Sequence, residues 1–88
     1  MQDGTYFMQD GHYLPVTPDY GYFVAVQEDT RVADKAPFVG VWTSPEGQHM
    51  EEPSTRLLSL ELATQRGLAH QQYSIWDCTN GREIKLNV

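Results

Sequence analysis

The 88-residue chain has room for a single domain, residues 1–88, and its 40% hydrophobic and 11% aromatic content excludes a fully disordered protein. Twelve acidic and six basic side chains give a formal net charge of −6. This balance argues against direct binding of duplex nucleic acid, because such binding depends on cations that neutralise phosphates.

Residues 1–19 predict an N-terminal hairpin or a partly mobile arm. Two short segments with apolar and aromatic side chains flank Asp10 and Gly11. The Asp-Gly pair supplies the positive φ angles that a tight hairpin turn needs. Pro15 and Pro18 follow, and we expect them to interrupt regular pairing because neither has an N–H to donate.

The middle of the chain predicts three strands. Residues 20–27 are rich in aromatic and β-branched side chains that alternate, as in a strand with two different faces. Residues 28–37 are polar and predict a loop, after which residues 38–43 predict a second strand. The Ser-Pro-Glu-Gly sequence at residues 44–47 is typical of a type I turn, so we expect a short return strand over residues 48–51.

Residues 55–70 predict a helix. The segment contains mainly Leu, Ala, Gln, Glu and Arg, which favour helices. On a helical surface its leucines and alanines form two stripes, which predicts a helix that packs on both flanks. Ser54 or Ser59 could cap its N-terminus, and Gly67 suits its last turn.

The C-terminus predicts a closing hairpin. Residues 72–77 and 82–88 have the composition of strands and flank Asn80 and Gly81, the strongest two-residue hairpin signal. We therefore expect an α+β fold, with a small antiparallel sheet of about five strands, one α-helix packed on a face and the N-terminal hairpin.

Catalytic chemistry is not expected from this sequence. The single cysteine, Cys78, excludes an internal disulfide, and the neighbouring Asp77 opposes formation of its thiolate. The three histidines, at positions 12, 49 and 70, lack the spacing of a zinc site. Common nucleotide-binding and hydrolase motifs are absent. We predict that the protein is not an enzyme and has no cofactor or metal.

The cytoplasm is the expected location. No apolar run reaches the ~18 residues of a membrane-spanning helix. The first residues lack the positive and apolar parts of a secretory signal, and a single unpaired cysteine fits a reducing compartment. Membrane association is therefore not expected.

The N-terminal third carries the feature that leans most toward a function. Residues 1–30 contain five acidic residues and no Lys or Arg, together with six of the ten aromatic residues. Such a surface attracts a basic partner, although the same charge also serves solubility. We predict a non-catalytic protein that binds and inhibits or regulates a basic partner protein, as antitoxins, immunity proteins and phage anti-defence inhibitors do. The expected contact residues are Asp3, Tyr6, Asp10, Tyr13, Asp19 and Tyr20.

The alternative is a protein that binds a small ligand or a nucleotide, with a site that a homodimer could complete. Aromatic side chains would stack on a ring of the ligand while an arginine holds its anionic group. The residues expected to do this are Trp42, Trp76, Tyr73, Arg56, Arg66 and Arg82. The competing interpretation places both tryptophans in the core, because large aromatic side chains dominate small cores.

Overall fold

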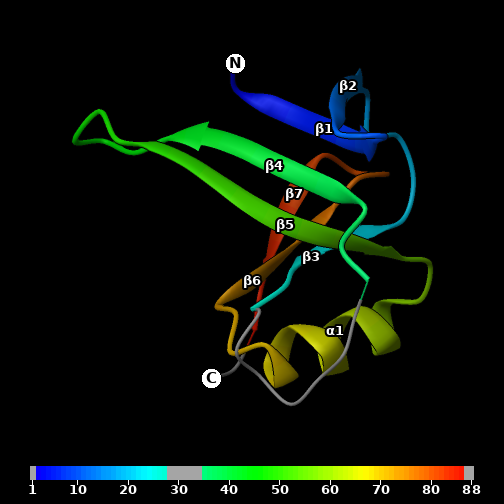
Figure 1. Ribbon diagram of the computed structural model, residues 1–88. Helices are drawn as coiled ribbons and strands as arrows, with labels where there is room; N and C mark the ends of the chain where they lie inside the picture. The colour runs from blue at the N-terminus through cyan, green and yellow to red at the C-terminus, as the bar shows by residue number, and fades with distance from the viewer. Residues whose placement is uncertain (1, 28–34, 87–88) are drawn as a thin grey trace.

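The computed structural model describes residues 2–27 and 35–86, and these form one antiparallel sheet with a helix (Figure 1). The strand order across the sheet is β2-β1-β4-β5-β3-β6-β7. The elements, in chain order, are β1 (Gly4–Gln9), β2 (His12–Val16), β3 (Tyr22–Ala25), β4 (Phe38–Thr43), β5 (His49–Leu57), α1 (Leu60–Ala69), β6 (Ser74–Asp77) and β7 (Arg82–Lys85).

The predicted fold, a sheet of about five strands with one helix packed on a face, is wrong. The described residues form seven antiparallel strands in one open sheet with a single short helix, so the protein is mostly sheet. The N-terminal hairpin joins this sheet through pairing of β1 with β4. The helix is also shorter than predicted, because residues 55–57 belong to the end of β5.

Strand β5 is nine residues long because Pro53 does not break it. The Pro53 carbonyl accepts the Val26 N–H at 2.8 Å, so it points toward the β3 side of β5. Because the N–H and C=O groups of one strand residue point to the same side, the position of the missing Pro53 N–H also faces β3. The last β3 pair joins Ala25 to Ser54, one residue before Pro53 is reached. The proline therefore removes no hydrogen bond from the β4 ladder, and the strand continues beyond residue 51, where the predicted return strand ends.

The two predicted hairpins at the ends of the chain are confirmed. Asp10 and Gly11 have φ angles of 50° and 78° in the turn between β1 and β2, as a tight turn with two left-handed residues requires. Pro15 lies inside β2 rather than ending it, because β2 is an edge strand. The closing hairpin pairs β6 with β7.

The remaining predictions in the middle of the chain have mixed outcomes. Strand β4 has the predicted bounds, and the Gly47 N–H donates to the Ser44 carbonyl at 2.9 Å in the predicted turn. Most of the predicted loop, residues 28–34, lies outside the described residues. The predicted strand over residues 20–27 is confirmed as the shorter β3.

Helix α1 packs against β3, β5 and β6 through small side chains (Figure 1). Ala63 and Gly67 are its buried residues, and Ala63 joins Val24 and Ile75 in the core cluster. The expectation that leucine stripes pack the helix is wrong: Leu60, Leu62 and Leu68 are 46%, 47% and 41% exposed. The small residues let the helix approach the sheet closely, and its leucines face outward.

Both ends of α1 are capped. The Ser59 hydroxyl accepts the Leu62 N–H at 3.3 Å, which makes Ser59 the N-cap of the two candidates. At the other end the Gln71 N–H donates to the Leu68 carbonyl and the Gln72 N–H to the Gly67 carbonyl. This is a Schellman motif with Gln71, at φ 57°, in the left-handed position that glycine usually occupies.

The described chain is compact, with a Cα radius of gyration of 12.5 Å against about 12 Å expected for 88 residues. Its principal extents of 31, 31 and 29 Å are nearly equal, so the seven-stranded sheet is curved rather than flat. No helix in the described residues is long and apolar enough to span a membrane.

Candidate functional site

The strand register divides the side chains of the sheet between two faces. Val24 packs against α1, so its neighbour Phe23 points to the opposite face, because successive strand residues alternate. Phe23 pairs with Arg56 of β5 and with Trp76 of β6, which places these side chains on the same face. We call this surface, opposite to α1, the open face.

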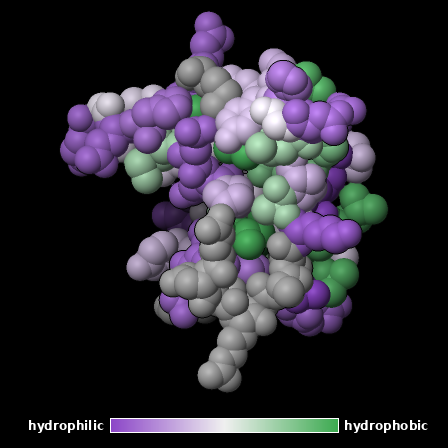
Figure 2. Space-filling view, viewed as in Figure 1, coloured by the Kyte–Doolittle hydropathy of each residue, from purple (hydrophilic) through white to green (hydrophobic). Residues whose placement is uncertain are grey.

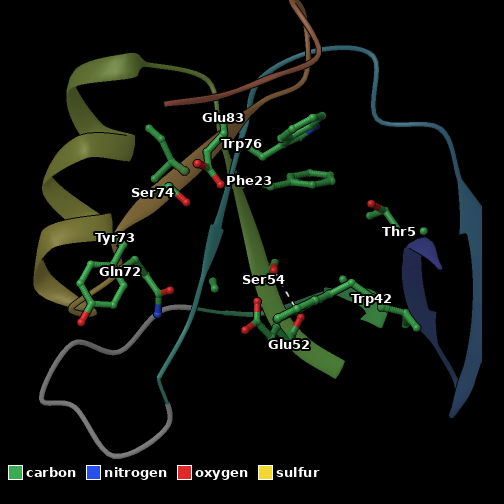
Figure 3. A pocket seen from close by; sticks show the side chains of 15 residues that line it. Thr5, Phe23, Trp42, Glu52, Ser54, Gln72, Tyr73, Ser74, Trp76 and Glu83 are labelled. Carbon is green, nitrogen blue, oxygen red and sulfur yellow. Dashed lines mark hydrogen bonds between the residues drawn. The ribbon is translucent and has the colours of Figure 1, made fainter. Parts of the chain in front are cut away.

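The open face contains a cavity of about 710 Å³ (Figure 3). Small residues contributed by four strands leave the space at its centre: Ala25, Gly40, Ser54 and Ser74. Large or charged side chains surround them, among them Phe23, Trp42, Glu52, Tyr73, Trp76 and Glu83. The hollow therefore follows from the residue sizes that the register brings to one face.

Aromatic side chains form the walls of the cavity. Trp76 lies beside Phe23 on one side, and Trp42 lies across the cavity on β4 (Figure 3). The expectation of core tryptophans is wrong, since Trp42 and Trp76 are each 41% exposed. Tyr73, on the segment between α1 and β6, is 80% exposed. Three of the residues expected to contact a ligand are thus brought to one cavity.

Each tryptophan has a glutamate neighbour on the adjacent strand. Trp76 and Glu83 are directly opposed in the pairing of β6 with β7. Glu52 pairs with Gly40 of β4, which places it diagonal to Trp42 on the same face. These two glutamates are the charged side chains that line the cavity among the described residues. The cavity therefore combines aromatic rings with negative charge.

The three arginines expected to hold an anion do not line this cavity. Arg66 lies in the last turn of α1. Arg82 contacts Asp77, with 3.5 Å between its Nε and the Oδ2 atom. Arg56 is on the open face but within a separate group of rings. The register therefore does not support an anion site beside the tryptophans.

Arg56 is enclosed by aromatic rings next to the cavity. Its Cζ atom lies 4.2 Å from the ring centre of Tyr20, 5.1 Å from that of Phe23 and 4.9 Å from that of Phe38. The Nε atom is buried and has no hydrogen-bond partner. The guanidinium therefore lies within cation–π distance of three rings. The close approach of its stem is possible at Gly21, where a Cβ atom would lie 3.1 Å from the Arg56 Cγ.

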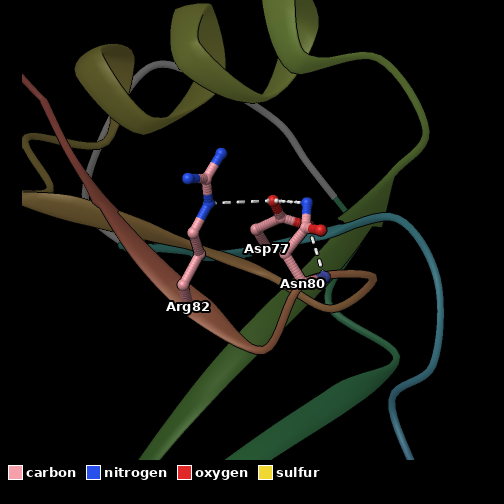
Figure 4. A network of polar contacts seen from close by, with 3 residues as sticks. All are labelled: Asp77, Asn80 and Arg82. Carbon is pink, nitrogen blue, oxygen red and sulfur yellow. Dashed lines mark hydrogen bonds and ion pairs between the residues drawn. The ribbon is translucent and has the colours of Figure 1, made fainter.

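Asp77 organises the turn of the closing hairpin (Figure 4). Its carboxylate accepts the Asn80 backbone N–H at 3.3 Å and the Asn80 Nδ2–H at 2.8 Å. The hydrogen bonds from Asn80, assisted by Arg82, hold the pKa of Asp77 below its ordinary value although burial acts in the opposite direction. Arg82 therefore has a structural partner rather than a ligand-binding position.

The six residues expected to bind a partner do not share one surface. Tyr6 and Tyr13 lie together, with ring centres 6.3 Å apart. Tyr6 pairs with Val39 of β4, which places both tyrosines on the face of the sheet opposite to the open face. Tyr20 instead covers Arg56 on the open face. The carboxylates also separate: Asp10 is in the hairpin turn, exposed Asp19 precedes Tyr20, and Asp3 accepts a hydrogen bond from Thr43 at 3.0 Å.

Cys78 is buried, with 6% of its surface exposed. Burial raises the pKa of its thiol, an effect that the charge of Arg56 partly opposes. A protonated, enclosed thiol is a poor nucleophile at neutral pH. Among the described residues no group of three His, Cys, Asp or Glu side chains could hold a metal ion.

No protein-family model, curated protein or solved structure matches this chain. The chemistry of the site therefore rests on its own residues. Sequence reasoning missed Glu52 and Glu83 as cavity residues. The alternation of Glu52, Ser54 and Arg56 along one strand could have indicated the first, but the predicted strand ended at residue 51.

Proposed function

We propose that this is a non-catalytic binding protein that attaches to a basic partner protein through the aromatic cavity of its open face. The observation that carries the proposal is that each cavity tryptophan has a glutamate beside it on the adjacent strand, directly opposite Trp76 and diagonal to Trp42, in a chain of net charge −6. Negative charge beside exposed rings favours a cationic partner and accelerates its encounter.

Exposed aromatic side chains support protein binding over a purely structural role for the cavity. Trp42, Trp76 and Tyr73 leave 41%, 41% and 80% of their surfaces in contact with solvent. Tyrosine and tryptophan are enriched in interfaces, where burial of their rings contributes much of the binding energy. A charge that served solubility alone would not require these rings beside it.

The proposed class of function is the one expected from the sequence, but the proposed binding surface is a different one. Antitoxins, immunity proteins and phage anti-defence inhibitors share this size and acidic character, and inhibition or regulation of the basic partner belongs to the proposal. A cytoplasmic location belongs to it as well. The binding surface is now the cavity rather than the N-terminal group of Asp and Tyr residues, because the register separates Tyr6 and Tyr13 from Tyr20.

Affinity purification identifies the partner, and purified components test the proposal. The tagged protein is isolated from its source cells at low salt, and native mass spectrometry gives the mass of the complex. The partner is then purified, and its affinity is measured for the wild-type chain and for a Trp42→Ala, Trp76→Ala variant. We expect binding at least about 30-fold weaker for the variant, since buried interface tryptophans act as hot spots.

A matched variant controls for the loss of exposed apolar surface. Leu58 and Leu62 are 73% and 47% exposed and lie near or on α1, away from the open face. Their replacement by alanine should leave the affinity within about twofold, the size of effect typical of residues outside a hot spot. Equal binding of the wild-type chain and the tryptophan variant would contradict the proposal, as would association that does not slow with added salt.

Binding of a small cationic ligand is the second candidate function. The cavity volume of about 710 Å³ lies within the ~300–1,000 Å³ range of small-molecule sites. An added mass of a few hundred daltons in the native mass spectrum would favour this candidate. A doubled mass would instead indicate the homodimer expected as part of the ligand-binding alternative.

A further inference from the structure

We propose that the cavity recognises one arginine side chain of the partner, with the guanidinium between the tryptophan rings and within reach of Glu52 and Glu83. This inference rests on the proposed function and names the chemical group that the cavity accepts. It follows from the order of rings and carboxylates around the cavity and from the way this chain holds its own Arg56.

The cavity offers both kinds of contact that a guanidinium makes. Its flat faces stack on aromatic rings, and its edge donates paired hydrogen bonds to a carboxylate. Trp76 with Glu83 provides both contacts on one side, and Trp42 with Glu52 provides both on the other. Figure 3 shows these two pairs on opposite sides of the open space. A lysine ammonium could use the charge but has no flat face to stack.

The protein already holds a guanidinium among rings on the same face. Arg56 lies between 4.2 and 5.1 Å from three ring centres, one of which is Phe23. Phe23 also lines the cavity, so the two ring groups are continuous. The cavity differs in two respects: it is open to solvent, and the carboxylates of Glu52 and Glu83 line it. An incoming arginine would therefore find rings and counter-charges together.

Among residues 2–27 and 35–86, no Lys or Arg side chain lines the cavity. Lys85 pairs with Ser74 and so shares the open face at the edge of the sheet, but it does not line the cavity. The charge of Arg56 is covered by the rings of Tyr20, Phe23 and Phe38. In the part of the chain that the structure describes, the charged groups that line the cavity are the two glutamates, and their negative charge favours an added cation.

A pair of short peptides tests the arginine proposal directly. The probe is acetyl-Gly-Gly-Arg-Gly-Gly-amide. The control peptide has citrulline in place of arginine, which keeps the shape of the side chain and removes its charge. Binding is followed through the NMR signals of the two indole N–H groups, assigned with Trp42→Phe and Trp76→Phe. We expect both signals to shift with the arginine peptide and the citrulline peptide to bind about tenfold more weakly.

Charge-matched variants show whether the glutamates of the cavity are responsible. A Glu52→Gln, Glu83→Gln chain should bind the arginine peptide about tenfold more weakly. A Glu46→Gln, Glu51→Gln chain undergoes the same change in net charge, but Glu46 is in an exposed turn and Glu51 points to the other face of β5. This control should bind within about twofold of the wild-type chain, because distant surface charges are screened.

The outcomes separate this inference from the proposed function. Equal binding of the arginine and citrulline peptides, or indole signals that do not move, would overturn the arginine proposal. In that case the proposed function would still stand if the Trp42→Ala, Trp76→Ala chain bound the purified partner much more weakly than the wild-type chain does. Arginine-selective binding without any basic protein partner would overturn the proposed function and leave the cavity as a guanidinium site.

Discussion

Replacement of Gly67 by alanine should destabilise the protein although alanine favours helices. Gly67 is a buried residue inside α1, and a Cβ atom there would lie 2.6 Å from Leu86 Cδ1 and 3.0 Å from Ile75 Cγ2. The Leu86 contact involves the end of a flexible side chain, which can move. The Ile75 contact is harder to relieve, because this side chain is 2% exposed and its β-branched χ1 angle is stiff.

Two opposing terms set the size of this effect. Gly→Ala inside a helix stabilises by about 1 kcal/mol. Overpacking of a dense core destabilises by about 1–3 kcal/mol. We therefore expect Gly67→Ala to lower the free energy of unfolding by about 1 kcal/mol net. For a chain of this length that difference corresponds to a fall of about 4–8 °C in the melting temperature.

Urea denaturation, monitored through tryptophan fluorescence, measures the difference in unfolding free energy between the variant and the wild-type chain. Gln65 is exposed on the same helix, and its glycine and alanine variants calibrate the helix propensity without the clash. In an Ile75→Ala background, Gly67→Ala should destabilise less by about 1 kcal/mol, because the Cγ2 atom that cannot move aside is gone. If Gly67→Ala stabilised the wild-type chain by as much as the difference between the Gln65→Gly and Gln65→Ala variants, the close packing of α1 against β6 would be refuted.

Three further predictions concern the helix end, the closing turn and the thiol. Gln71→Gly should raise the free energy of unfolding by about 1 kcal/mol, since Gln71 occupies the left-handed position, whereas Gln71→Ala should not; urea midpoints decide this. The pKa of Asp77 is lowered on folding, so its contribution to stability is complete above its ordinary pKa of 3.8 and is lost as the pH falls through the folded value. Asp77→Asn should reduce this loss of unfolding free energy when the protein is titrated with acid. An unchanged slope of unfolding free energy against pH would contradict the role of Asn80 as hydrogen-bond donor. Iodoacetamide should modify Cys78 much more slowly in the native protein than in urea; equal rates would show that the thiol is not buried.

Local patterns predict the elements whose structure depends on neighbouring residues in the chain. Asp10-Gly11 and Asn80-Gly81 predict both terminal hairpins, because the positive φ angles of Asp10, Gly11 and Gly81 are local properties of the two turns. The Ser59 cap is likewise among the predicted candidates. These features follow from backbone preferences that do not require knowledge of the rest of the fold.

The length of β5 depends instead on the neighbouring strands. Pro53 normally indicates a break, but here the position of its missing N–H faces β3 just beyond the last pair, Ala25 with Ser54, so the β4 ladder loses no hydrogen bond. Without the pairing partners of the strand, the leucines after residue 56 were as consistent with a helix as with a strand end. The count of strands and the start of α1 could not be predicted for this reason.

The candidate site shows the same division between residue type and position. Trp42, Trp76 and Tyr73 were expected to bind a ligand, and the register brings all three to one cavity. The charged residues beside them are Glu52 and Glu83 rather than arginines, because the pairing of distant strands decides which side chains meet. Residue types thus predicted the rings of the site, whereas only the register identifies the charge beside them.

The central claim is that the open face is the binding surface, and the most direct test maps the contact itself. An isotope-labelled chain is mixed with its purified unlabelled partner, and amide and indole NMR signals are compared before and after binding. The account predicts that the largest changes lie at Trp42, Trp76 and their neighbours on the open face. Changes centred on Tyr6 and Tyr13, with the tryptophan signals unaffected, would contradict it.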